Sequence, residues 1–99
     1  MVIEEAYVYI MASVSGTLYV GSTIDLVGRV RTHKANAIPG FSSKYRCHKL
    51  VYYETYAELD EARVREYQIK GWVRKKKERL IRIQNPTWVD LSRFWDDDS

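Results

Sequence analysis

A chain of 99 residues, of which 45% are hydrophobic, can bury one core but is too short to bury two. Its 16 Lys and Arg residues and 13 Asp and Glu residues give a net charge of +3, which rises to +6 without Asp96, Asp97 and Asp98; this balance suits a polyanionic partner or an ordinary, mildly basic domain. Cys47 is the only cysteine, which excludes an internal disulfide and therefore a secreted, disulfide-stapled domain.

The N-terminus carries two acidic residues, Glu4 and Glu5, at the place where a secretion signal has basic ones. The apolar stretch that follows is too short and too rich in tyrosine to cross a membrane. The sequence therefore predicts a cytoplasmic protein without a membrane partner. It also predicts one domain over residues 1–95, followed by an acidic tail over residues 96–99.

The first two elements are predicted to form a β-hairpin. Residues 6–12 are rich in β-branched and aromatic side chains, residues 13–16 are typical of a turn, and residues 17–22 form the returning strand. Successive side chains of a strand point to opposite faces. Tyr9 and Tyr19 are therefore expected on the same side of the sheet, if the hairpin register permits it.

A helix is predicted after the hairpin, with Asp25 as its N-cap and apolar residues at helical spacing behind it. Arg29 and His33 are four residues apart, so they lie on one flank of this helix. A loop containing Pro and Gly at residues 39–43 ends the pattern. A third strand is then predicted over residues 50–56.

A second helix is predicted over residues 57–70, with a core-facing stripe that consists of Leu59, Ala62, Glu66, Ile69 and Val73. The carboxylate of Glu66 is unfavourable in a core unless it is paired, hydrogen-bonded or bound to a metal. Two interpretations stay open at this stage. Glu66 is either a metal ligand or a residue at the edge of the stripe with a salt bridge to a neighbour.

A third helix is predicted to begin with a basic run at residues 74–77 and to stop at Asn85 and Pro86. An aromatic C-terminal segment is expected to pack back onto the domain. With its strands first and its helices interleaved, the sequence predicts an α+β fold, in which helices flank a small mixed or antiparallel sheet of three strands.

Taken in order, these residues resemble a GIY-YIG nuclease domain. The pattern consists of Tyr7-Val8-Tyr9, Tyr19-Val20-Gly21, Arg29, His33, Glu66 and Asn85, with the further blocks 49–54 and 85–88. The chain is most similar to the small stand-alone members related to the nuclease domain of the bacterial excinuclease incision subunit, over roughly residues 6–91. It departs from the family at Tyr7, where the motif has glycine.

The resemblance implies a three-stranded sheet flanked by helices, a divalent metal ion held by Glu66, and hydrolysis of nucleic-acid phosphodiester bonds. Residue by residue, the family's catalytic set falls on Tyr9, Tyr19, Arg29, His33 and Glu66, with Asn85 in a supporting role. His33 matches a position that holds His or Tyr in relatives.

The chemistry of these side chains agrees with the implied roles. A guanidinium such as that of Arg29 can bridge two phosphate oxygens in a fixed fork. A Mg²⁺ ion keeps most of its waters, so Glu66 alone is a sufficient protein ligand. We expect Tyr19 to relay the proton from the attacking water and Tyr9 to orient it, although a phenol is a poor base at neutral pH. On strand propensity alone, both tyrosines would be packing residues.

We therefore expect a Mg²⁺- or Mn²⁺-dependent endonuclease that hydrolyses DNA, in repair or recombination, as a monomer or weak dimer. The alternative is a nucleic-acid-binding module of the same fold with weak or no cleavage. Two basic clusters are candidate nucleic-acid contacts: Lys44, Arg46 and Lys49 after the loop, and Arg74, Lys75, Lys76 and Lys77 in the third helix. The second cluster is also compatible with a solvated helix face.

Overall fold

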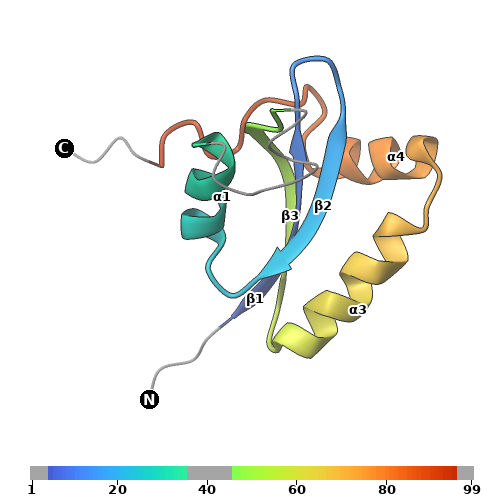
Figure 1. Ribbon diagram of the computed structural model, residues 1–99. Helices are drawn as coiled ribbons and strands as arrows, with labels where there is room; N and C mark the ends of the chain where they lie inside the picture. The colour runs from blue at the N-terminus through green and yellow to red at the C-terminus, as the bar shows by residue number, and fades with distance from the viewer. Residues whose placement is uncertain (1–4, 36–45, 96–99) are drawn as a thin grey trace.

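The computed structural model describes residues 5–35 and 46–95, and in these ranges the elements follow the order β1-β2-α1-β3-α3-α4 (Figure 1). Their bounds are β1 Ala6–Ala12, β2 Leu18–Thr23, α1 Leu26–Lys34, β3 Lys49–Tyr56, α3 Leu59–Lys70 and α4 Arg74–Gln84. The strands form one antiparallel sheet in the order β2-β1-β3. The predicted α+β class is thereby confirmed, and the sheet is antiparallel rather than mixed.

The strand β1 lies at the centre of the sheet and is buried on both faces. Val8 and Ile10 pack on one side against residues of α3 and α4, whereas Tyr9 and Met11 pack on the other side against residues of α1. Figure 1 shows α1 on one side of the sheet and α3 and α4 on the other. The predicted alternation of faces is confirmed, since a two-residue period assigns these side chains to opposite cores.

The hairpin register places Tyr9 opposite Gly21 and Met11 opposite Tyr19. Tyr9 and Tyr19 are therefore diagonal neighbours on the α1 side of the sheet, as predicted. The strand β2 lies at the edge of the sheet, next to β1. Groups from both faces of the sheet can consequently approach each other around it.

Asp25 caps α1 as predicted, because its carboxylate accepts a hydrogen bond of 3.0 Å from the amide of Gly28. The helix α3 begins two residues later than predicted, with a capping box between Glu58 and Glu61. It ends at Lys70, with Gly71 as C-cap.

The predicted core stripe of α3 is wrong at two positions. Val73 lies beyond the end of the helix and is 73% exposed. Glu66 is not in the core either, since its side chain is 20% exposed at the flank of the helix. Ala62 and Ile69 are buried as expected.

Asn85 joins the end of α4 to the rest of the domain. Its buried side-chain amide donates to the carbonyls of Val51 at 3.0 Å and Val89 at 2.7 Å, and its oxygen accepts from the amide of Val89 at 3.2 Å. The segment behind it returns to the sheet, where Leu91 donates to the carbonyl of Leu50 at 2.7 Å. The predicted packing of the C-terminal aromatic segment is confirmed for Trp88, Leu91 and Trp95, whereas Phe94 is 67% exposed.

Three sequence predictions lie outside the described residues: the loop at 39–43, Lys44, and the acidic tail over residues 96–99. Within the ranges that are described, no helix is long and apolar enough to span a membrane.

Candidate active site

A cluster of three rings occupies the α1 side of the hairpin. The hydroxyl of Tyr9 lies 3.0 Å from Nε2 of His33, which places the third turn of α1 directly against β1. The ring of Tyr19 packs edge-on against His33, with 4.8 Å between the centroids, and lies 6.2 Å from the ring of Tyr9. Tyr9 and His33 are buried, whereas Tyr19 is only half-buried. The cluster therefore has a closed inner part and one tyrosine that borders solvent.

The protonation states of the inner pair follow from burial and nearby charge. Burial is the largest effect that raises the pKa of the Tyr9 hydroxyl, and the nearby guanidinium of Arg29 offsets part of the rise. Burial, followed by the charge of Arg29 and then that of His48, lowers the pKa of His33 to about 4. At neutral pH Tyr9 is therefore protonated, and it shares a hydrogen bond with a neutral imidazole.

This pair predicts a pH dependence of stability. The unfolded chain takes up a proton on His33 near pH 6.5, whereas the folded chain takes it up only near pH 4. Since the unfolded state binds more protons in this window, the free energy of unfolding should fall as the pH is lowered, by about 2 kcal/mol between roughly pH 6.5 and pH 5. Urea titrations at these two pH values would measure the difference.

His33→Gln is the matched control for that measurement, because a glutamine oxygen can still accept from Tyr9 and does not titrate. The carboxylates Glu54 and Asp90 have lowered pKa values, so their contributions are lost only below about pH 4.5 and do not affect the comparison. An equal loss of stability in wild type and His33→Gln would contradict the assignment.

Gly21 makes room for the cluster. A Cβ atom at this position would lie 2.5 Å from the hydroxyl oxygen of Tyr9 and 2.6 Å from the adjacent ring carbon. The ring of Tyr9 thus extends across the backbone of β2 toward His33, which only a residue without a side chain permits. The last position of the second tripeptide is glycine for this reason.

Gly21→Ala should therefore displace Tyr9 and separate it from His33. Overpacking of this kind costs about 1 to 3 kcal/mol of stability. The displacement should also shift the ring resonances of His33 in NMR spectra. Gly71→Ala is a suitable control, since a Cβ there would meet no atom closer than 3.5 Å. Similar losses in both variants would show that the effect does not depend on Tyr9.

Glu66 approaches the same strand from the other face of the sheet. Its Oε1 accepts a hydrogen bond of 2.5 Å from the hydroxyl of Ser22, the residue of β2 next to Gly21, and its Oε2 pairs with Nζ of Lys70 at 2.5 Å. Arg29 and Glu66 both act on the pKa of Tyr9, which places the guanidinium and the carboxylate near the same phenol. The edge of β2 therefore carries a phenol, an imidazole, a guanidinium and a carboxylate.

The salt bridge to Lys70 matches the second interpretation that the sequence left open, in which Glu66 lies at the edge of the stripe. This contact does not conflict with metal binding. Glu66 is a partly exposed carboxylate beside a strand edge, and Lys70, which is 53% exposed, is a cation that can leave. Within the described residues no three His, Cys, Asp or Glu side chains converge as a metal cluster. The donor set fits an ion that retains most of its water, such as Mg²⁺.

A hollow of about 240 Å³ gives access to the exposed tyrosine. Its lining consists of Leu18, Tyr19, Val20, Lys70 and Lys77. Two lysines beside the half-buried phenol make this surface positively charged. A phosphate group is complementary to this surface in charge.

The basic run of α4 is heterogeneous. Arg74 pairs with Glu78 at 2.7 Å, and Arg82 approaches the same carboxylate at 3.8 Å. The ammonium of Lys76 lies 4.2 Å from the centroid of the Trp72 ring. Lys77 lines the hollow beside Tyr19, whereas Lys75 is exposed. The structure thus brings Lys77 to the site, while Arg74 and Lys76 make contacts within the protein.

The other basic cluster lies at the start of β3. Arg46 and Lys49 line a second hollow together with His48. Of the three residues in the predicted cluster, Lys44 lies outside the described residues.

Four neighbours of the site were not predicted: Gly21 as the space for Tyr9, Ser22, Lys70 and His48. The pairing of Lys70 with Glu66 could have been predicted from the sequence, because Lys70 follows Glu66 by four residues on a predicted helix. Ser22 follows from alternation along β2 once the register is known. His48 is near His33 only through the tertiary fold, so no sequence signal identifies it.

Comparison with known proteins gives a consistent result. The family described as the GIY-YIG catalytic domain matches residues 5–79. A UPF0213 protein of Staphylococcus aureus is 38% identical over 80% of this chain and 96% of its own length, and one of Bacillus pumilus is 37% identical over 76% of each. The solution NMR structure of a UPF0213 protein from Bacillus halodurans superposes with a TM-score of 0.56 at 27% identity, covering 85% of this chain and 89% of that one.

Proposed function

Since the chain belongs to the GIY-YIG catalytic domain family and is similar to UPF0213 proteins, we propose that it is a divalent-metal-dependent endonuclease that hydrolyses phosphodiester bonds in DNA. The family is one of nucleases, which supports the reaction type. The observation that carries the proposal is the contact of Tyr9 and Tyr19 with His33 on one face of the sheet, with the carboxylate of Glu66 hydrogen-bonded to Ser22 of the edge strand β2.

Arg29 is the residue that grips the scissile phosphate. It is exposed on α1 near the hydroxyl of Tyr9, and its guanidinium has five N–H donors. These donors can bind two nonbridging oxygens as a fork and neutralise the charge that builds up on them.

Tyr9 and Tyr19 have different roles in the proposed reaction. Tyr9 is buried and bonded to His33, so it acts as a positioning residue for Arg29 and for the ring of Tyr19. Tyr19 borders the hollow and is the phenol that an attacking water can reach. In the reaction a new P–O bond forms to the water while the P–O bond to the leaving oxygen breaks. Tyr19 relays the proton: its oxygen accepts the proton of the water as its own proton passes to solvent, and the leaving oxygen takes up a proton from solvent.

Glu66 would hold the metal ion, with the hydroxyl of Ser22 fixing one carboxylate oxygen. When bound, Mg²⁺ or Mn²⁺ supplies Lewis-acid stabilisation of the phosphate and leaving oxygens. Lys70 must leave Oε2 of Glu66 for the second oxygen to become available.

Removal of Lys70 should therefore tighten metal binding. Lys70→Met deletes a competing i,i+4 ion pair and a nearby positive charge, which together correspond to a roughly twofold to fivefold lower Kd for Mn²⁺. Calorimetric titration without nucleic acid measures this directly. Lys75→Met, an exposed lysine of α4, is the control and should leave the Kd unchanged. Equal Kd values for wild type and Lys70→Met would place the metal elsewhere.

Incubation of the purified protein with labelled single-stranded, duplex and branched DNA, and with the corresponding RNAs, tests the proposal. Cleavage is expected with Mg²⁺ or Mn²⁺ and not with EDTA. A preference for RNA would change the proposed substrate from DNA to RNA, and the proposed phosphodiester hydrolysis would stand.

The Glu66–Lys70 ion pair favours one second candidate, a nucleic-acid-binding module of the same fold with weak or no cleavage. In such a protein Lys70 would remain on the carboxylate. Binding of every substrate in the panel, with no product at any metal concentration, would establish that candidate.

A further inference from the structure

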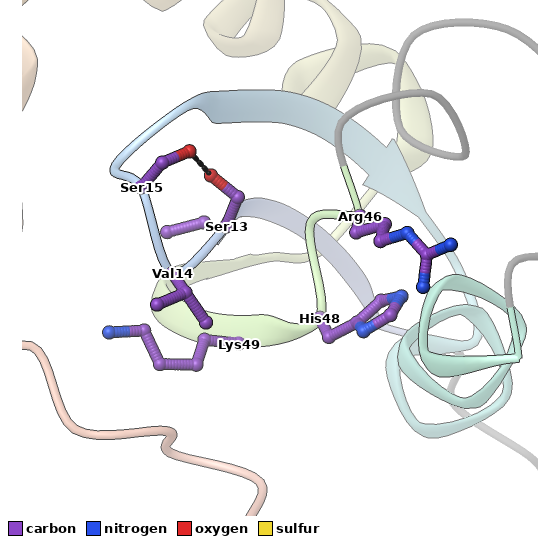
Figure 2. A pocket seen from close by; sticks show the side chains of 7 residues that line it. Ser13, Val14, Ser15, Arg46, His48 and Lys49 are labelled. Atoms are coloured by element: carbon purple, nitrogen blue, oxygen red, sulfur yellow. Dashed lines mark hydrogen bonds between the residues drawn. The ribbon is translucent and has the colours of Figure 1, made fainter.

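A hollow lies at the tip of the hairpin, on residues other than those of the candidate active site. It has a volume of about 440 Å³ and lies between the β1–β2 turn and the segment that enters β3. The turn contributes Ser13, Val14 and Ser15, and the opposite wall contributes Arg46, His48 and Lys49 (Figure 2). No carboxylate is among the lining residues, so the hollow has a one-sided positive charge.

The opposite wall is held in place by its one buried residue, Cys47. This side chain packs in the α1-side core, and its thiol donates to the carbonyl of Thr17 at 3.7 Å. Arg46 and His48, its neighbours, are left nearer the surface. Arg46 has a φ of 53°, a left-handed conformation that costs a non-glycine residue about 1 kcal/mol or more and often marks a functional position.

The cations of this wall differ from those of α4. On α4, Glu78 pairs with Arg74 and approaches Arg82, so part of that charge is compensated within the helix. Among the described residues, neither Arg46 nor Lys49 forms an ion pair. Figure 2 shows Arg46 and His48 directed to the side on which α1 lies, with Lys49 extending the other way. The positive charge of the wall is therefore available to an external anion.

The hollow adjoins the catalytic cluster. The charge of His48 contributes to the lowered pKa of His33, so the two imidazoles are close enough to interact. Along β1, Tyr9 is three residues from Ala12, which pairs with Lys49 and also lines the hollow. Three strand residues span about 10 Å. The hollow is therefore close enough to the cluster for one nucleic-acid strand to contact both.

We propose that this hollow binds the backbone of the nucleic-acid strand that is cut, with Arg46 and Lys49 each contacting a different phosphate on its two sides. This inference rests on the proposed function and extends it with further contact points on the same strand. Arg46 and Lys49 supply the charge, and the exposed Ser15 supplies a hydroxyl at the mouth of the turn. Contacts of this kind bind phosphate and do not read sequence.

Binding measured in EDTA tests the inference independently of cleavage. Each phosphate contact contributes about 0.7 to the slope of log K against log salt for a single strand, so Arg46→Gln/Lys49→Gln should lower the slope by roughly 1.4. Lys49→Gln alone, which leaves the strained residue 46 unchanged, should lower it by about half as much. The control Arg63→Gln/Arg93→Gln removes two exposed arginines elsewhere and should leave the slope nearly unchanged.

A series of oligonucleotides lengthened one nucleotide at a time locates the contact. Wild type should gain affinity at the length that reaches the hollow, and the double variant should not. Equal slopes for the double variant and either wild type or the control would overturn the inference. Binding of inorganic phosphate is seen as amide shifts at residues 46–49. A double variant that loses this binding but keeps wild-type binding of the oligonucleotides would also overturn the inference. If the salt slopes are as predicted but no cleavage is observed, the result counts against the nuclease proposal and not against this inference.

Discussion

Glu66→Gln should lower metal-dependent cleavage by roughly 10³-fold or more while leaving the fold and nucleic-acid binding intact. Metal stabilisation of transition-state charge is worth several kcal/mol, and each 1.36 kcal/mol corresponds to a factor of ten in rate. Gln retains the shape of the side chain and an oxygen that can accept from Ser22. It lacks the negative charge that a Mg²⁺ ion requires.

The stability of this variant should change little, by about 0.5 kcal/mol or less. The carboxylate is 20% exposed and its Lys70 partner 53% exposed, so the lost ion pair is a solvated helix pair. Single-turnover cleavage, thermal melting and DNA binding in EDTA give the three measurements. Asp60→Asn removes a carboxylate from the first turn of the same helix and serves as control. Wild-type cleavage by Glu66→Gln would exclude Glu66 as the metal ligand.

Arg29→Lys should lower the cleavage rate by about 10²-fold, although the positive charge is kept. An ammonium is a compact point charge and cannot bridge two phosphate oxygens in a fixed fork. Loss of one preorganised donor to a developing oxyanion has an effect of this size. Because the interaction is made in the transition state, the loss should appear mainly in kcat rather than in KM.

Arg31→Lys provides the comparison for that variant, since Arg31 is also exposed on α1. It should cleave at nearly the wild-type rate. An unchanged kcat in Arg29→Lys would show that bidentate binding of two phosphate oxygens by Arg29 does not contribute to catalysis.

Much of the fold could be predicted from the sequence because its signals are local. The alternation in β1 assigns Val8 and Tyr9 to opposite cores, and the Asp25 cap marks the start of α1. The ordered motif predicts the family, which the matching of residues 5–79 confirms. These features depend on neighbours within a few residues, where periodicity and capping are informative.

The errors and omissions have a common cause in tertiary geometry. Val73 continues the helical spacing of the stripe, but α3 ends at Lys70, so the spacing carries no meaning beyond Gly71. Glu66 fits the stripe on a helical wheel, yet the helix is turned so that this side chain meets Ser22 at the sheet edge. The approach of His48 to His33 depends on how β3 enters the sheet, which no local pattern encodes.

The central claim is that a metal ion is held by Glu66 at the edge of β2, beside the tyrosine cluster. Bound Mn²⁺ broadens the NMR signals of nearby nuclei, so a titration of the isotope-labelled protein locates the ion directly. The account predicts that the amides of Ser22, Glu66 and Lys70 broaden first, and that this broadening disappears in Glu66→Gln. Broadening centred on other carboxylates, such as Glu54 or Asp90, or broadening that persists in Glu66→Gln, would contradict it.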